Sequence, residues 1–130
     1  MQVIHLDNSE FFRRLMRFFL IKKGVESKSF EEANQALDII KNDKNVIVIA
    51  GTYFAGMSLI DFVKEIRALP YYVPILILTS GTASEDQHDL IQNIDVDAYI
   101  EKTGSWETST AFYLDKWIEK LESNSNSSPV

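Results

Sequence analysis

The sequence of 130 residues contains no cysteine. Disulfide frameworks, cysteine-ligated zinc sites and thiol catalysis are therefore excluded together. Histidine is also scarce, and His5 and His88 lie too far apart to match a metal-ligand spacing. We interpret His5, which lies inside an apolar run, as a hydrogen-bonded core residue, and His88 as a surface residue.

Positive charge is in short supply as well. The chain has 13 Lys and Arg against 19 Asp and Glu, a formal charge of -6 and a pI near 4.8. It thus lacks the general basic field that would attract nucleic acid or an anionic membrane. Met1 leads directly into an apolar run without a signal-like segment, and no apolar run is long enough to span a bilayer. We expect a cytoplasmic protein that binds another protein, with no nucleic-acid or membrane binding.

Short apolar runs alternate with helical patterns along the chain. The run from Val46 to Ala50 contains four β-branched residues, which is typical of a strand buried on both faces. The alternation predicts an α/β fold: a three-layer, doubly wound (flavodoxin-like) sandwich with a five-stranded parallel sheet of order 2-1-3-4-5 and five helices. The predicted strands cover about 3–6, 25–30, 46–50, 75–79 and 98–101, and the predicted helices 9–23, 31–41, 58–69, 85–93 and 106–121.

The alternating pattern ends at Leu121. Residues 122–130 are polar and rich in Ser and Asn, a composition that predicts a disordered tail or the stub of a linker. We therefore expect one domain over residues 1–121, and an attached effector domain after Val130 is one form that its partner can take.

The candidate functional residues follow the predicted strands. In open α/β sheets the chemistry lies beyond the carboxyl ends of the strands. The residue directly after the central strand is a glycine, which brings no side chain to this edge. The candidates there are Asp7, Asn8, Gly51, Thr52, Thr79 and Lys102.

Over about residues 2–121, this ordered set resembles the receiver domain of bacterial response regulators. Each motif alone is weak, and their order along the chain makes the resemblance specific. Leu6-Asp7-Asn8-Ser9 stands where the family has a hydrophobic residue and an acidic pair. The other matching stretches are Gly56-Met57-Ser58 and Phe62 to Arg67 after the phosphorylation site, Pro74 to Thr79 with its switch residue, and Asp97 to Lys102 with its aromatic Tyr99 and its lysine.

The resemblance implies phosphoryl transfer from a histidine kinase to an aspartate after the third strand, with Mg²⁺ held by that aspartate and the acidic pair. It places Gly51 at the acceptor position and Asn8 in place of one acid. Asp7 is then the only acidic metal candidate, and Mg²⁺ prefers several oxygen ligands. We expect weak or absent Mg²⁺ binding and no other cofactor.

Neighbouring residues do not replace the absent carboxylate. Thr52 offers only a hydroxyl, and Asp61 lies well inside the third predicted helix. We predict that Lys102 pairs with Asp7, because a partly buried lysine without a partner carries a desolvation penalty. Thr103 replaces the family's proline after the lysine, and we expect a trans peptide bond before it.

Two groups of retained residues each have two interpretations. Thr79 and Tyr99 either serve packing alone or form a switch that a partner biases in place of phosphate. Phe11 and Phe18 lie at the margin of a wide apolar arc on the first helix. They are either buried by a neighbouring element or form a hydrophobic contact with a partner or a second copy. Phe112 falls on the polar side of the last helix and is a further candidate interaction residue.

We interpret the chain as a degenerate receiver of two-component (phosphorelay) type. It would not be an enzyme and would act by protein–protein interaction without phosphorylation, on a signalling protein or an attached effector domain. Two alternatives stay open at this point. One is a phosphoaccepting regulator that uses a non-standard residue, and the other is a small-molecule sensor with its ligand in the pocket beside Gly51.

Overall fold

The computed structural model describes residues 1–80 and 93–126. Strands and helices alternate along this part of the chain, as the apolar pattern predicted. In chain order the elements are β1 (Gln2–Leu6), α1 (Glu10–Lys22), β2 (Ser27–Phe30), α2 (Ala33–Ile40), β3 (Val46–Ala50), α3 (Leu59–Arg67), β4 (Ile75–Thr79), β5 (Ala98–Glu101) and α5 (Trp106–Asn126).

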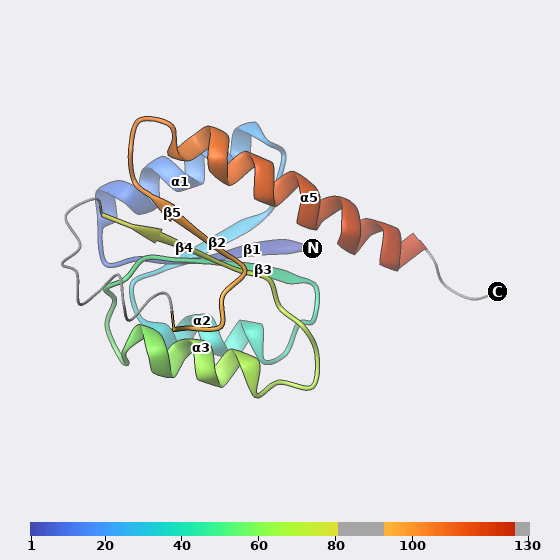
Figure 1. The fold of residues 1–130 in the computed structure, drawn as a ribbon, viewed down its shortest axis with the longest axis horizontal. Helices are drawn as coiled ribbons and strands as arrows, with labels where there is room; N and C mark the ends of the chain where they lie inside the picture. Colours follow the sequence, from blue (N-terminus) through green and yellow to red (C-terminus); the bar gives the residue numbers. More distant parts are fainter. Residues whose placement is uncertain (81–92, 127–130) are drawn as a thin grey trace.

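The five strands form one parallel sheet in the order β2-β1-β3-β4-β5. Helices α1 and α5 cover one face of the sheet, and α2 and α3 cover the other (Figure 1). This architecture confirms the predicted three-layer sandwich and its strand order. Four helices lie in the described part of the chain. The further helix predicted over 85–93 falls almost entirely on residues 81–92, outside the described residues.

The sheet separates two apolar cores. Every residue of β3 is fully buried, with Val46 and Val48 in the core beneath α2 and α3, and Ile47 and Ile49 in the core beneath α1 and α5. Burying a large aliphatic side chain contributes roughly 1.5–3 kcal/mol relative to leaving it exposed. The central strand thereby anchors both layers and fixes where its carboxyl end lies.

Local capping residues set the helix that follows β1. The Ser9 hydroxyl accepts a hydrogen bond from the Phe12 amide at 3.1 Å, which satisfies one of the free N–H groups at the start of α1. Gly24 ends the same helix with a φ of 70°, a left-handed conformation that glycine adopts without steric cost. Ser9 and Gly24 thus fix the beginning and the end of α1.

Several predicted boundaries differ from the structure, most of them by one or two residues, and two of the differences have a clear local cause. Strand β2 begins at Ser27 and not at 25, because the Val25 amide donates to the Leu20 carbonyl in the turn after α1. Helix α5 continues to Asn126, so residues 122–126, expected in a disordered tail, are helical, and its last turns project past the sheet (Figure 1). No glycine or proline stops the helix in this stretch. Residues 127–130 lie outside the described residues.

Candidate functional site

The carboxyl edge of the sheet brings the predicted site residues together from four strands. Asp7 follows β1 and Gly51 follows β3, and the Gly51 amide donates to the Leu6 carbonyl at 2.8 Å. Lys102 follows β5, and its amide donates to the Thr79 carbonyl of β4 at 2.7 Å. The parallel register therefore places side chains that are distant in the sequence at one edge.

Asp7 is the centre of this group, and its side chain is 2% exposed. One carboxylate oxygen, Oδ2, accepts from the Lys102 ammonium at 2.7 Å, and the other, Oδ1, accepts from the Ser9 amide at 2.9 Å. Arg13 donates to the Asp7 backbone carbonyl at 2.7 Å. The ion pair predicted between Lys102 and Asp7 is confirmed, and these contacts meet the buried negative charge.

The Lys102 ammonium has a second partner that sequence reasoning did not find. Its Nζ lies 4.1 Å from the centroid of the Phe12 ring, a cation–π contact. Phe12 sits on the inward face of α1, and nothing in the sequence links it to a lysine so far along the chain. The Lys102 side chain is 20% exposed, so aromatic and carboxylate groups together replace most of its water.

Gly51 leaves no empty space beside it. A Cβ atom built on this residue would lie 2.7 Å from Asp7 Oδ2 and 3.0 Å from Asp7 Cγ. These separations are below van der Waals contact, so any side chain at position 51 requires the Asp7 carboxylate to move. The carboxylate thus occupies the space into which a side chain on Gly51 would extend.

The other predicted pocket residues lie around this pair. Asn8 is exposed, and its backbone N–H donates to the Tyr53 carbonyl at 3.1 Å. Thr52 is half-buried. Thr79 is buried, and its hydroxyl donates to the Tyr99 hydroxyl at 3.3 Å, so the two predicted switch residues are in contact. The peptide bond before Thr103 is trans, as predicted.

His5 differs from its prediction. It is fully buried as expected, but among the described residues neither ring nitrogen has a hydrogen-bond partner. Its ring faces Phe12 at 5.9 Å, inside the apolar layer under α1. Burial lowers the pKa of His5 to about 4, with smaller contributions from Lys102 and Arg13 in the same direction and from Asp7 in the opposite one. The interpretation as a hydrogen-bonded histidine is therefore wrong, because none of the described residues places a donor or acceptor within hydrogen-bonding distance of the ring. His88 lies outside the described residues.

A family model for the response regulator receiver domain matches residues 3–110. The chain belongs to this family. It is therefore a receiver domain of the two-component signalling type. No curated protein sequence matches this receiver.

Solved structures show the same fold. A CheY-like receiver domain protein from Methanospirillum hungatei is 17% identical, with 95% of this chain and 97% of that chain covered and a TM-score of 0.77. The chemotaxis response regulator CheY4 of Vibrio cholerae is 22% identical, with 92% and 97% covered and a TM-score of 0.72. The receiver domain of a sensor histidine kinase from Pseudomonas aeruginosa, which has a magnesium ion coordinated in its active-site cleft, is 19% identical, with 91% and 98% covered and a TM-score of 0.77.

The side chains of this receiver do not fit a magnesium ion. Mg²⁺ requires near-octahedral coordination by oxygen atoms, usually with one or two carboxylates. Here one carboxylate, Asp7, is present, and its two oxygens are engaged by Lys102 and Ser9. Gly51 supplies no ligand, and within residues 1–80 and 93–126 no group of three acidic or histidine side chains could hold a metal.

The three phenylalanines predicted as interaction residues are all solvent-exposed. Phe11 is 73% exposed, Phe18 66% and Phe112 65%. The interpretation that a neighbouring element buries Phe11 and Phe18 is therefore wrong. These two residues sit on the flank of α1, while Phe12 and Phe19 occupy its inward side.

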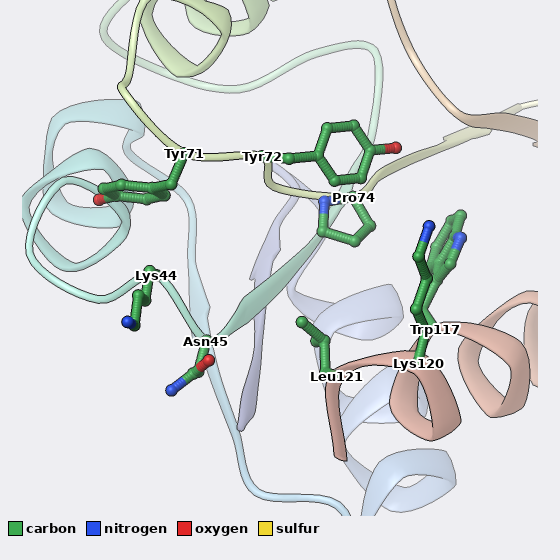
Figure 2. Close-up of a pocket in the computed structure, with 8 residues that line it drawn as sticks. All are labelled: Lys44, Asn45, Tyr71, Tyr72, Pro74, Trp117, Lys120 and Leu121. Atoms are coloured by element: carbon green, nitrogen blue, oxygen red, sulfur yellow. The ribbon is translucent and has the colours of Figure 1, made fainter. Parts of the chain in front are cut away.

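A separate groove of about 650 Å³ lies at the opposite, amino edge of the sheet (Figure 2). It opens between α5 and the segments that lead into β3 and β4. Because it lies away from Gly51, it is not the ligand pocket expected there. Its lining residues are Lys44, Asn45, Tyr71, Tyr72, Pro74, Trp117, Lys120 and Leu121.

In the described part of the chain, no helix is both long and apolar enough to cross a membrane.

Proposed function

We propose that this receiver is degenerate: it lacks the phosphoacceptor carboxylate and signals through protein contacts without being phosphorylated. The observation that supports this most strongly is the ion pair between Asp7 and Lys102, with the Asp7 carboxylate seated against Gly51. The pair joins the lysine that would meet a phosphoryl group to the one remaining acid. A pocket closed in this way has neither an acceptor nor a vacant metal ligand.

The same contacts argue against Asp7 as a substitute acceptor. Phosphorylation of an aspartate requires a carboxylate oxygen that is free to attack the phosphorus atom. In Asp7 one oxygen is held by an ammonium and the other by a backbone amide, and the residue is 1% exposed. Attack by either oxygen would require the contact of that oxygen to break inside a buried site, which is costly. Without an acceptor, the chain would not catalyse its own phosphorylation and would not be an enzyme.

The arrangement also gives no support to a sensor with a ligand beside Gly51. The space next to this glycine is filled by the Asp7 carboxylate, within 2.7 Å of where a Cβ would lie. A ligand would have to displace a group that is paired with Lys102. Protein contact through the exposed aromatic residues of α1 and α5 is the output that we propose.

Titration with Mg²⁺ and beryllium fluoride, followed by NMR amide shifts, tests the proposal. The wild-type protein is expected to show no saturable shift at residues 7, 51, 79 or 102. The variant Asn8→Asp/Gly51→Asp serves as the matched control. It places three carboxylates together, so it should be less stable without metal and should regain stability when Mg²⁺ is added. Saturable binding by the wild-type protein would overturn the proposal.

A further inference from the structure

An apolar stripe runs along the exposed flank of α1. Phe11, Leu15 and Phe18 follow one another at spacings of four and three residues, so they share one side of the helix. Phe11 and Phe18 are mostly exposed, Leu15 is 37% exposed, and nearby Ile21 is 60% exposed. Single exposed apolar residues are ordinary in soluble proteins, but a contiguous row of them indicates a surface that another molecule covers.

Helix α5 lies beside α1 on the same face of the sheet (Figure 1), and it carries the exposed Phe112. Two contacts join the helices: Trp106 packs against Phe12 and Phe19, and the Lys23 ammonium pairs with Asp115 at 2.6 Å. The outer side of this layer, defined by Phe11, Leu15, Phe18 and Phe112, is called the α1/α5 surface below.

The two helices carry opposite charge. The segment of residues 10–23, which includes α1, contains five basic residues and one acidic residue. Helix α5 contains four acidic residues and two lysines. Lys22 of α1 and Glu107 and Glu119 of α5 are exposed, and within the described residues none of them forms an ion pair. The α1 segment is therefore net basic and α5 net acidic, and both helices carry exposed aromatic rings.

We infer that the α1/α5 surface is the interface of a homodimer, in which α1 of each copy packs on α5 of the other. A twofold axis repeats the same contact twice, so a net-basic helix and a net-acidic helix side by side on one face can pair with a second copy of themselves. The apolar row of α1 then covers Phe112 of the partner subunit, and unpaired charges of opposite sign come together. An interface of α1 against α1 would instead bring Arg14 and Lys22 close to the same basic residues of the other copy, with like-charge repulsion.

This inference rests on the proposed function only in that protein contact is the output. Sedimentation velocity over increasing concentrations, up to about 100 µM, should show a monomer–dimer equilibrium that weakens with added salt. Phe18→Ala and Phe112→Ala should each weaken the dimer roughly tenfold or more with nearly unchanged melting temperature. The control is Tyr72→Ala, which removes an exposed aromatic side chain at the amino edge of the sheet, outside the α1/α5 surface. It should leave the monomer–dimer equilibrium unchanged.

Charge reversal distinguishes the two ways of pairing. The variants Arg14→Glu/Lys22→Glu and Glu107→Lys/Glu119→Lys should each be monomeric, because in each variant positions 14, 22, 107 and 119 all carry charge of the same sign. Mixed in equal amounts, they should form a heterodimer, because the acidic α1 then meets the basic α5 and the basic α1 meets the acidic α5. If the Glu107→Lys/Glu119→Lys variant alone still dimerises, the α1-to-α5 interface is wrong.

Other outcomes also decide between the claims. A wild-type protein that stays monomeric, or whose α1/α5 surface binds only a different protein, would overturn the homodimer and leave the proposed function standing. A dimer that binds beryllium fluoride and Mg²⁺ would overturn the proposed function and leave the homodimer standing.

Discussion

At His5 the chain buries an imidazole without giving it a partner. Its two ring nitrogens are fully enclosed, and no donor or acceptor among the described residues reaches them. A buried polar group without a hydrogen bond costs roughly 1–3 kcal/mol of stability. We therefore expect His5→Leu to raise the free energy of unfolding at neutral pH by about this amount.

The same residue makes the stability of the protein pH-dependent. Because the pKa of His5 falls from 6.5 to about 4 on folding, the unfolded chain binds the proton more tightly. The contribution of neutral His5 to stability is fully present above pH 6.5 and is lost as the pH falls toward 4. Roughly 2 kcal/mol of the free energy of unfolding is lost between pH 7.5 and 5. Urea unfolding at these two pH values should show that His5→Leu removes about this much of the pH dependence. An unchanged pH dependence in the variant would contradict the assignment.

The ion pair between Asp7 and Lys102 could be predicted from the sequence, because both residues directly follow strands that end at the same edge of the sheet. Asp7 and Lys102 each follow a predicted strand, and burial of either charge alone would be costly. The contact of Lys102 with Phe12 was not predictable, since it depends on how α1 is rotated over the sheet. The unpartnered state of His5 was not predictable either, because a short apolar run does not show whether a hydrogen-bonding group lies opposite.

At the scale of single elements, the ends of β1 and β3 come so close that the residues after them compete for one space. Gly51→Ala places a Cβ against the Asp7 carboxylate and pushes it away from Lys102. We expect a loss of about 1–3 kcal/mol in the free energy of unfolding. Gly104→Ala is the matched control, because no atom lies within 4 Å of its added Cβ. Equal effects of the two substitutions in thermal or urea unfolding would show that Asp7 does not fill the space at Gly51.

Element boundaries followed the sequence where a residue fixes the backbone, and departed from it where none does. Ser9 and Gly24 set the ends of α1 as expected. The predicted end of α5 at residue 121 is too early, because a change to polar composition does not by itself end a helix. Polar residues continue a helix when no glycine or proline interrupts it, and α5 reaches Asn126.

At the scale of the whole molecule, five short apolar runs and the helical patterns between them were enough to predict the sheet order. The parallel order follows from right-handed connections and from β3, whose five residues are buried on both faces. Which helix faces stay exposed was harder to predict. The wide apolar arc of α1 is compatible with burial or exposure, and only the positions of its neighbours leave Phe11 and Phe18 uncovered.

In this chain the receiver fold is intact, while the carboxyl edge of its sheet differs from the family pattern at Gly51. The receiver sandwich needs its buried strands and capped helices, and these are intact. Phosphoryl transfer needs an additional carboxylate after β3, where this chain has Gly51. We infer that the fold persists here as a scaffold for surfaces such as the one on α1 and α5.

Intact-mass spectrometry after incubation with acetyl phosphate and Mg²⁺ is the most direct measurement of this account. A single phosphoryl group changes the mass of the whole chain, so the readout does not depend on which residue is tested. Without an acceptor carboxylate, the mass should stay that of the unmodified 130-residue chain. A fraction with one added phosphoryl group, absent when the protein is unfolded before incubation, would show that a residue of the folded receiver accepts the phosphoryl group and would contradict this account. Loss of that fraction on replacing Asp7 by Asn would identify Asp7 as the acceptor.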